Sequence, residues 1–282
     1  MKIDKVSIYI PVYNSEKTIE FTINSILNQS HKFDEIIIID DFSKDNTLDI
    51  VNQFNGIKLI KNSSNRGLGY CRNLGIKNSS NQIIASIDSD VELHEEWLKV
   101  MLEKFNINPN IICGGNMEEK FLKNKFNFWR AKYYSQNWGN NDIVNPPFLY
   151  GCNTIQNKNI WKEIGGYDET FNTNGEDIDY SKKIHLAKKF KLIYCSKANC
   201  KHLQNDNLNS LAYRVWRYHS FGYKIKKRSI NRFFKLSIKQ IKFFIKRSMS
   251  DILKLKFNLL YLNFMIMIKF IILEFKNIDK KI

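Results

Sequence analysis

Short apolar runs alternate with helix-like repeats along the N-terminal third of the chain. The runs at 6–10, 36–39, 57–60 and 83–87 are four or five residues long, which is typical of buried strands. Between the first two runs, apolar residues recur at helical spacing at Ile19, Ile23 and Ile26. Strands that alternate with helices predict βαβ units and a mostly parallel sheet, that is, an α/β fold.

Three of these strands end directly in segments that could meet a ligand: Pro11 to Asn14, Asp40-Asp41 and Asp88-Ser89-Asp90. Right-handed crossovers bring the carboxyl ends of such strands to one edge of the sheet. Ligands of open α/β sheets bind at that edge, so we expect these residues to lie together around a ligand.

Asp88 and Asp90 are separated only by Ser89, and two carboxylates this close repel each other unless a positive charge lies between them. A hard divalent cation that keeps open positions for phosphate oxygens fits this arrangement. The alternative is an acidic turn that caps the next helix. Asp40-Asp41 and Glu176-Asp177 allow the same alternative, but three independent caps at one edge are a less economical explanation.

Later segments have a less regular pattern. Residues 116–148 are rich in aromatic residues, Asn and Lys without clear periodicity, and we interpret them as an irregular lobe over the site. The run at 149–155 predicts a strand that returns to the sheet, and 191–194 predicts another. Glu176-Asp177 opens a predicted helix, and helices dominate from residue 205 onward.

The positive charge of the chain is concentrated at its C-terminal end. The whole chain of 282 residues carries a net charge of +16. Residues 1–205 hold 26 Lys and Arg against 24 Asp and Glu, a net of +2, whereas residues 206–282 hold 18 against 4, a net of +14. We therefore expect an α/β domain over 1–205 and a basic helical tail over 206–282, with an anionic partner for the tail.

Cysteine usage and the N-terminus indicate a cytoplasmic protein. The five cysteines are odd in number and include no Cys-x-x-Cys pair, which argues against a disulfide framework or a thiolate zinc site. Reduced, buried thiols are the expectation. Asp4, Lys5 and Pro11 interrupt the N-terminal apolar segment, so we expect no signal peptide.

An ordered series of motifs carries a resemblance to a known family. The series comprises 6–14, 36–43, Asn65-x-Gly67 with Cys71-Arg72-Asn73-x-Gly75, Asp88-Ser89-Asp90, Gly151-x-Asn153, 165–169 and Glu176-Asp177. Over about residues 5–202 the chain resembles the inverting, family-two nucleotide-sugar glycosyltransferases of the GT-A fold. The resemblance implies a Rossmann-like, mostly parallel central sheet flanked by helices, here with a helical C-terminal extension.

The resemblance also implies a donor site. Pro11, Val12 and Tyr13 would line the nucleoside pocket, and Asp41 would accept a hydrogen bond from a uracil-type base. Asn65 and Arg72 would frame the pocket, although a solvated helix residue is an equal alternative for Arg72. Asp88 and Ser89 would complete the donor site, with Asp88 on the ribose or on a metal-bound water.

Metal, base and acceptor roles follow from the same resemblance. Asp90 would bind Mn²⁺ or Mg²⁺ directly, and the metal would stabilise the departing diphosphate. His202 would complete the metal site, with a surface or packing histidine as the alternative. Asp177 would be the general base for the acceptor hydroxyl. Glu176 and Asn153 would lie on the acceptor side.

The resemblance implies transfer of one sugar from a nucleotide donor, expected to be a UDP-sugar, to a glycan or lipid-linked acceptor. Processive synthases of this family carry a Gln-x-x-Arg-Trp signature, and the chain has Val215-Trp216-Arg217-Tyr218 instead. Two alternatives are a sugar-1-phosphate nucleotidyltransferase and a non-catalytic membrane-bound scaffold. The first usually has a Gly-rich phosphate loop near the first strand, which 11–14 lacks.

The tail predicts a membrane contact. Phe234, Ile238, Ile241, Ile245, Met249 and Ile252 follow helical spacing, and Lys235, Lys239, Lys242 and Lys246 run one residue later. This pattern is typical of an amphipathic helix on the anionic inner face of a cell membrane. A helix packed on the catalytic domain is the alternative, and no motif supports nucleic acid. For the more apolar 257–273 we favour an interfacial or re-entrant segment over a transmembrane helix.

Overall fold

The computed structural model describes residues 5–171, 173–221 and 229–278 and divides the chain into two compact units. The sheet unit comprises residues 1–120 and 135–204, and the helical unit comprises residues 121–134 and 205–282. The helical unit thus takes in part of the segment that the composition assigned to an irregular lobe. Residues 222–228 and 279–282 of the expected tail lie outside the described residues.

The sheet unit is built on one mixed sheet of nine strands, in the order β3-β2-β1-β4-β8-β6-β9-β5, with β7 paired to β9. The strands are β1 (Val6–Val12), β2 (Glu35–Asp40), β3 (Ile57–Lys61), β4 (Ile83–Ile87), β5 (Val91–Leu93), β6 (Ile111–Glu119), β7 (Ile143–Val144), β8 (Asn153–Asn157) and β9 (Lys191–His202).

The four N-terminal strands β3, β2, β1 and β4 are parallel, as the alternating pattern predicts. Their side chains alternate between two apolar layers: Ile36 and Ile38 join one core cluster, whereas Ile37 and Ile39 join the other. Because both faces of the sheet are covered, the strand is apolar throughout rather than alternating with polar residues.

The second half of the sheet is mixed in direction. Strand β8 is antiparallel to both β4 and β6, and β5 and β7 are antiparallel to β9, while β6 and β9 are parallel. The pairing of β6 with β9 shifts register between Gly115 and Asn116. Strand β9 continues to His202, well beyond the expected end at residue 194.

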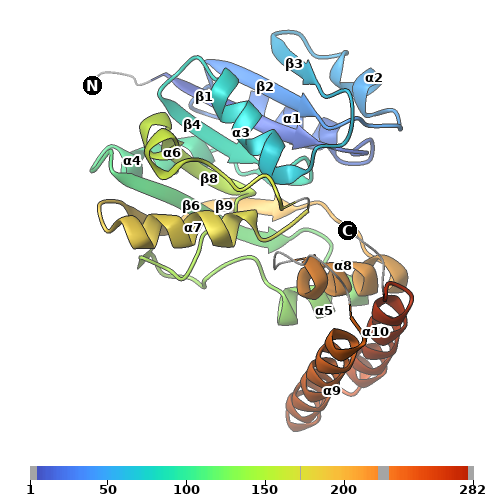
Figure 1. Cartoon of the computed structure of the whole chain (residues 1–282). Coiled ribbons are helices and arrows are strands. Elements are labelled where there is room, and N and C mark those ends of the chain that lie inside the picture. Colours follow the sequence, from blue (N-terminus) through green and yellow to red (C-terminus); the bar gives the residue numbers. More distant parts are fainter. Residues whose placement is uncertain (1–4, 172, 222–228, 279–282) are drawn as a thin grey trace. The chain divides into compact units, whose positions relative to one another are not determined.

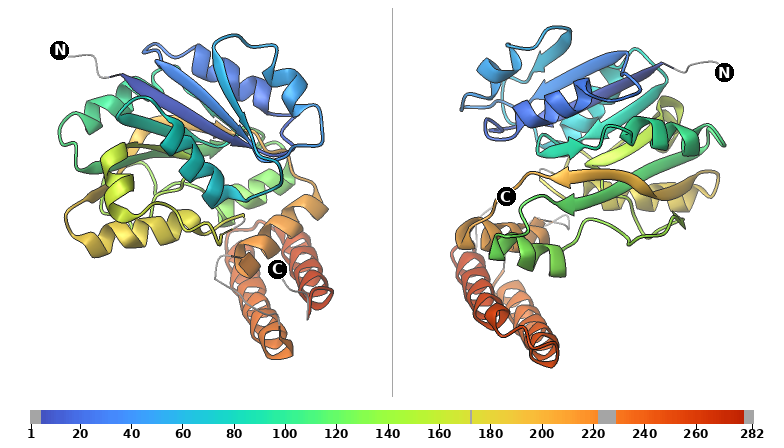
Figure 2. Two further views of the ribbon diagram at one scale, coloured as in Figure 1. Left: turned by 45° about the horizontal axis from the view of Figure 1, so that its top comes forward. Right: turned by 180° about the vertical axis from the view of Figure 1, so that it is seen from behind.

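Helices cover both faces of the sheet (Figures 1 and 2). One layer contains α1 (Ile19–Leu27), α2 (Thr47–Val51) and α4 (Trp97–Phe105). The other contains α3 (Leu68–Asn78), α6 (Lys158–Ile164) and α7 (Glu176–Ala187). The loops at the carboxyl ends of β1, β2 and β4 lie at one edge of the sheet. The loop after β4 contacts α3 through Arg72 and Asp88, and α1 through Thr22 and Ser89.

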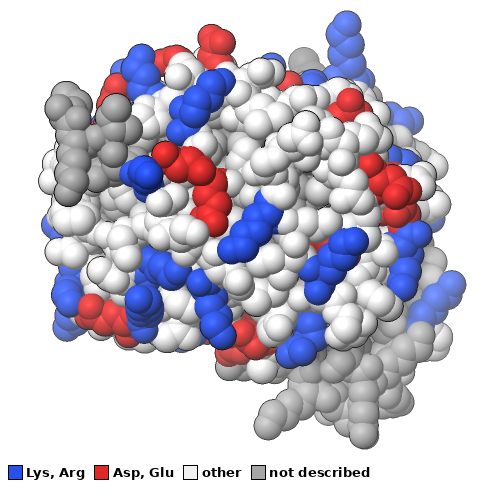
Figure 3. Space-filling view, turned by 90° about the horizontal axis from the view of Figure 1, so that it is seen from above, with Lys and Arg blue, Asp and Glu red and all other residues white. Residues whose placement is uncertain are grey.

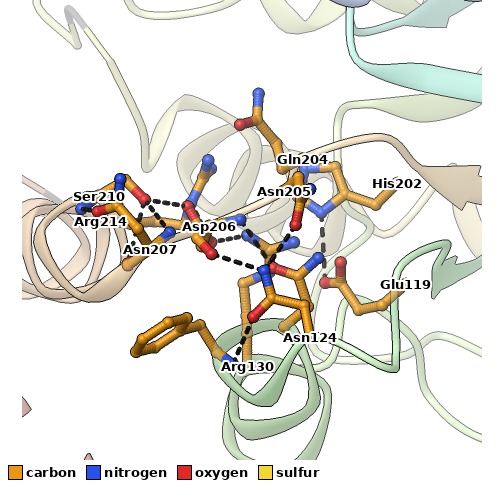
Figure 4. Close-up of polar contacts among 12 residues, drawn as sticks. Glu119, Asn124, Arg130, His202, Gln204, Asn205, Asp206, Asn207, Ser210 and Arg214 are labelled. Carbon is orange, nitrogen blue, oxygen red and sulfur yellow. Dashed lines mark hydrogen bonds and ion pairs between the residues drawn. The ribbon is translucent and has the colours of Figure 1, made fainter.

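The helical unit has its own core. It consists of α5 (Lys125–Tyr133), α8 (Leu208–Phe221), α9 (Ile230–Leu253) and α10 (Asn258–Phe275). Trp129, Trp216, Leu262 and Phe270 are buried together in one apolar cluster. Asp206 receives contacts from Arg130, Ser210 and Arg214 within this unit (Figure 4).

Candidate active site

The expected ligand edge is present at the ends of β1, β2 and β4. The amide of Asp41 donates to the carbonyl of Val12 at 2.8 Å, and the hydroxyls of Ser15 and Ser89 lie 2.7 Å apart. The β1–β2 ladder continues to Val12↔Asp40, but the β1–β4 ladder ends at Tyr9↔Ser86. After Tyr9, the main chain of β1 is therefore no longer paired with β4, and this unpaired part lies where a nucleoside is expected.

Asp41 anchors the loop that follows β3. Its carboxylate accepts hydrogen bonds from the Asn62 amide at 2.8 Å and from the backbone amides of Arg66 and Gly67 at 2.7 and 2.8 Å. These contacts fix the loop that carries Asn65, whose side chain is exposed. A direct contact from Asp41 or Asn65 to a base stays a prediction.

The other expected nucleoside residues divide into buried and exposed groups. The side chains of Pro11 and Val12 are buried, so only their main chain could face a base. Tyr13 is 50% exposed at the same edge. Tyr13 is therefore the residue of this set whose side chain is placed to meet a ligand.

Arg72 lies in the interior, so the alternative of a solvated helix residue is wrong. Its side chain is 2% exposed and contacts Asp88 Oδ1 at 2.9 Å and Glu176 Oε1 at 3.1 Å. It also donates to Ser86 Oγ and to the carbonyl of Gly151, each at 2.8 Å. Burial alone would lower the pKa of Arg72, but Asp88 and Glu176 raise it well above its ordinary value, so the guanidinium stays charged.

Gly151 connects this guanidinium to the proposed base. The Gly151 carbonyl accepts from Arg72, while its amide donates to Asp177 Oδ2 at 3.2 Å. A Cβ at Gly151 would lie 3.0 Å from Arg72 Nη2 and 3.2 Å from Asp177 Cβ. Glycine therefore allows the backbone to pass between the two side chains.

Glu176 and Asp177 form the first turn of α7, as the sequence predicts, where the helix dipole stabilises negative charge. Burial, reinforced by Asp177, raises the pKa of Glu176 to about 7 against the opposing effect of Arg72. Burial also raises the pKa of Asp177, although Arg72 and two backbone amides oppose the shift. A carboxylate with a raised pKa is a better proton acceptor near neutral pH.

Asp90 and His202 meet on neighbouring strand ends. Asp90 Oδ2 lies 3.3 Å from His202 Nε2 and accepts from the Gln204 amide at 2.8 Å. On its other side, His202 Nδ1 lies 3.3 Å from Glu119 Oε1 (Figure 4). Burial opposes protonation of His202, but Asp90 and Glu119 outweigh it and raise the pKa of the imidazole.

These residues fit a divalent cation that shares its coordination with phosphates. Within the described residues, no group of three or more His, Cys, Asp and Glu side chains is arranged so that it could hold a metal ion. Asp88 and Asp90 nevertheless supply hard oxygen donors, and His202 presents its Nε2 to Asp90. Mg²⁺ and similar ions are commonly bound by one or two carboxylates plus substrate phosphates and water.

Ser89 and Asn153 make contacts inside the protein rather than facing a ligand. The Ser89 carbonyl accepts from Thr22 Oγ1 at 2.9 Å, and its hydroxyl faces Ser15. Asn153 is 1% exposed, and its Oδ1 accepts from Trp97 Nε1 at 2.7 Å. The donor role of Ser89 and the acceptor role of Asn153 stay predictions, which these internal contacts do not support.

Glu119 and Gln204 belong to the site but were not predicted. Neither belongs to a recognisable motif, and each reaches the site through its position in or after a strand.

His202 follows an alternating pattern along β9, because Ala198, Cys200 and His202 are buried while the residues between them are exposed. This period of two places His202 on the inner face of β9.

Comparison with known proteins decides the family. The model of glycosyl transferase family 2 matches residues 7–165. The chain belongs to glycosyl transferase family 2. It is a glycosyltransferase with the GT-A fold, and its neighbours among solved structures agree with this fold. TarS of S. aureus is 21% identical, with a TM-score of 0.58, over 76% of this chain and 63% of that one.

A second structural neighbour is a mannosyltransferase from Pyrobaculum calidifontis in complex with GDP-Man and Mn²⁺. It is 16% identical, with a TM-score of 0.60, over 78% of this chain and 63% of that one. The identity of both neighbours is low, so they establish the fold alone.

Curated relatives of this glycosyltransferase include enzymes of glycolipid and polysaccharide synthesis. A glucosyl-dolichyl phosphate glucuronosyltransferase from Haloferax volcanii is 25% identical over 61% of this chain and 58% of the relative. A poly-beta-1,6-N-acetyl-D-glucosamine synthase from Staphylococcus epidermidis is 26% identical over 79% of this chain and 56% of the relative. The chain thus matches little more than half the length of these relatives.

Proposed function

We propose that this glycosyltransferase transfers a single sugar, with inversion, from a UDP-sugar to a glycan or lipid-linked acceptor. The observation that carries the proposal is the buried Arg72, which contacts Asp88 on the donor side and Glu176 on the acceptor side. One guanidinium therefore sets the spacing of the two groups of carboxylates. The named activities of the curated relatives support an acceptor of this class.

Asp177 is the proposed general base. In an inverting transfer, the acceptor oxygen forms a bond to the anomeric carbon as the bond to the diphosphate breaks. Asp177 takes the proton of the acceptor hydroxyl, and the Gly151 amide holds the carboxylate in place. Glu176, held in place by Arg72, fixes the first turn of α7, which also carries Asp177.

Asp90 and His202 are the residues proposed to hold Mn²⁺ or Mg²⁺, with Asp88 on the ribose or on a metal-bound water. When bound, the ion would act as a Lewis acid that stabilises the departing diphosphate. Glu119 fixes the orientation of the His202 ring, and Gln204 fixes the Asp90 carboxylate. Such secondary contacts commonly orient metal ligands in proteins.

Release of UDP from UDP-sugars tests the proposal and separates an enzyme from a scaffold. We expect full-length protein to hydrolyse or transfer at least one UDP-sugar in the presence of Mn²⁺ or Mg²⁺, and to lose this activity with EDTA. Turnover that is unaffected by EDTA would contradict the metal proposal. Absence of turnover with a panel of nucleotide sugars would favour the scaffold alternative.

We further propose that the helical unit binds the anionic inner face of a cell membrane. In α9 polar residues lie inside, whereas a helix on the surface of a soluble protein usually buries its apolar residues. Ser237, Gln240 and Asp251 are buried. The apolar residues instead face outward, with exposed fractions from 42% to 60%. They are Phe234, Ile238, Ile241, Ile245, Met249 and Ile252.

The charges of α9 complement an anionic surface. Lys235, Lys239, Lys242 and Lys246 are all exposed beside the apolar stripe. Lys242 and Lys246 also line an open groove of about 480 Å³ with Ile245 and Met249. An exposed apolar stripe flanked by lysines is the pattern of interfacial helices. On the face drawn in Figure 3, by contrast, acidic and basic side chains are interspersed.

The apolar helix α10 needs separate consideration, because it could lie in a membrane or in the core of the helical unit. Among the described residues it is the helix long and apolar enough to cross a membrane by length and composition, with 33% of it buried inside the protein. Leu259, Leu262, Ile266 and Phe270 pack into the core of the helical unit. We retain the interfacial placement, since this core needs α10 beside α8. All five cysteines are buried and free, as a cytoplasmic location requires.

A further inference from the structure

Phe42 occupies an unfavourable backbone conformation at the ligand edge. Its φ is +73°, in the left-handed region that a bulky side chain rarely adopts. Asn14, on the neighbouring loop, has a φ of +51°, but asparagine tolerates this region because its short side chain can bond locally. The aromatic residue is therefore the costly one of the pair.

The surrounding contacts prevent Phe42 from relaxing. On one side, Asp41 is fixed by the three hydrogen bonds to its carboxylate described above. On the other, the Ser43 amide donates to Asp40 Oδ1 at 3.2 Å, and the Ser43 hydroxyl accepts from the Asn14 amide at 3.0 Å. The Lys44 amide donates to Asn14 Oδ1 at 2.8 Å. A strained residue persists where its neighbours fix it in this way, and such residues cluster at functional sites.

The strained backbone holds the Phe42 ring outside the hydrophobic core. Phe42 is 39% exposed, and the Lys44 ammonium lies 3.3 Å from the ring centroid. Tyr13, 50% exposed, follows the adjacent strand β1. The strain therefore holds an aromatic face at the end of β2, beside the place where the nucleoside is expected.

We propose that Phe42 is a donor-binding residue whose ring forms a wall of the nucleoside site. Lys44 covers one face of the ring, and the base stacks on the other. The inference rests on the proposed function, since it requires a nucleoside diphosphate at this edge. Phe42 lies within the motif at 36–43, but the resemblance assigned no role to its side chain. The inference adds that role and predicts a trade of stability for affinity.

Phe42→Gly separates this role from a structural one. Glycine adopts a positive φ without strain, so the variant should melt about 2–6 °C higher than the natural chain. Loss of the stacking wall should weaken binding of UDP, measured calorimetrically with Mn²⁺, by about tenfold. Phe42→Tyr keeps the ring and should keep wild-type affinity.

Phe21→Ala is the matched control. Phe21 is also an exposed phenylalanine, 53% exposed, with the Lys120 ammonium 5.3 Å from its ring centroid, but it lies in α1. This variant should bind UDP as the natural chain does. Unchanged UDP affinity in Phe42→Gly, or a lowered melting temperature, would overturn the inference. If the natural chain itself binds no UDP, ADP, GDP or CDP, the proposed function fails as well, and the two failures are thereby distinguished.

Discussion

Arg72 and Glu176 are 104 residues apart in the chain, yet Arg72 Nε donates to Glu176 Oε1 at 3.1 Å in the interior of the sheet unit. Each side chain is 2% exposed. Two charges removed from water in this way depend on each other, because neither is stabilised by solvent. The pair joins α3 to the first turn of α7.

Arg72→Met should destabilise the protein by about 3–5 kcal/mol, since it leaves Glu176 buried without its partner. Adding Glu176→Gln to this variant should restore part of the loss, because the unpaired charge is then removed. Urea unfolding of the single and double variants measures the coupling. Arg66→Met, at an exposed site, is the control and should change stability by no more than about 0.5 kcal/mol. Equal stability of Arg72→Met and Arg66→Met would contradict the role of the pair.

Asp177→Asn should reduce turnover by about a hundredfold or more while UDP affinity is retained, because the base acts on the acceptor rather than on the nucleotide. Initial rates of UDP release, together with calorimetric binding, separate the two effects. Asp179→Asn is the matched control on the same helix, where Asp179 pairs with Lys183 at 3.2 Å. Near-normal turnover of Asp177→Asn would move the base to Glu176 or Asp179.

Asp90→Ala should abolish the dependence of UDP binding on Mn²⁺ while the fold survives. The expectation follows from the contact of Asp90 with His202 and Gln204 at the strand ends, since these groups converge on one carboxylate. Calorimetry with and without Mn²⁺ is the measurement. Asp49→Ala removes an exposed carboxylate from α2 and should leave the metal dependence intact. A metal effect that survives in Asp90→Ala would show that the ion binds elsewhere.

The sequence predicted the ligand edge because local patterns determine it. Four apolar runs and their polar ends are enough to place Asp41 and Asp88 at the ends of β2 and β4, the two parallel strands that flank β1. Arg72 could not be placed in this way, since a charged residue on a helix is ordinarily solvated and its partners Asp88 and Glu176 lie far along the chain. Burial of a charge depends on tertiary contacts that no local period records.

The tail illustrates the same limit. Helical spacing from Phe234 to Ile252 predicted the amphipathic helix, but an apolar stripe can face either a core or a membrane. The structure shows which residues lie inside the helical unit: Gln240 and Asp251 are buried, while Ile245 is 50% exposed. The stripe therefore does not face the core of this unit, and its contact with a membrane stays a proposal. The partners of Asp251 are Lys132 of α5 and Asn263 of α10, two helices that the sequence pattern did not connect to α9.

His219 should make the helical unit sensitive to acid. Burial, with Lys239 and Arg247 nearby, lowers its pKa from 6.5 to about 4, and Tyr134 contacts its Nε2 at 2.9 Å. The unfolded chain therefore binds the proton first, and stability is lost as pH falls from about 6.5 toward 4. His219→Gln should remove about 1–3 kcal/mol of this acid-dependent loss. Thermal melts across this pH range measure the slope, and an equally steep loss in the variant would contradict the assignment.

Replacing Lys235, Lys239, Lys242 and Lys246 of α9 by Gln should release the full-length protein from anionic vesicles. Each lysine near an anionic bilayer contributes about 1 kcal/mol at low salt, so the variant should also lose most of its salt dependence. Flotation with phosphatidylglycerol vesicles at low and high salt is the measurement. Full-length protein is required, because truncation before α9 would remove α10 from the core that contains Trp129 and Trp216.

The control for this experiment carries the same change of charge on the sheet unit. Lys77, Lys99, Lys162 and Lys182 are exposed there, and their replacement by Gln should leave vesicle binding nearly unchanged. A second variant, Ile238→Ser with Ile245→Ser, tests the apolar stripe and should weaken binding even at low salt. If both lysine variants lose vesicle binding equally, the attraction comes from overall charge rather than from α9. If the serine variant instead dissociates a dimer and leaves vesicle binding intact, the stripe is an interface between copies of the chain.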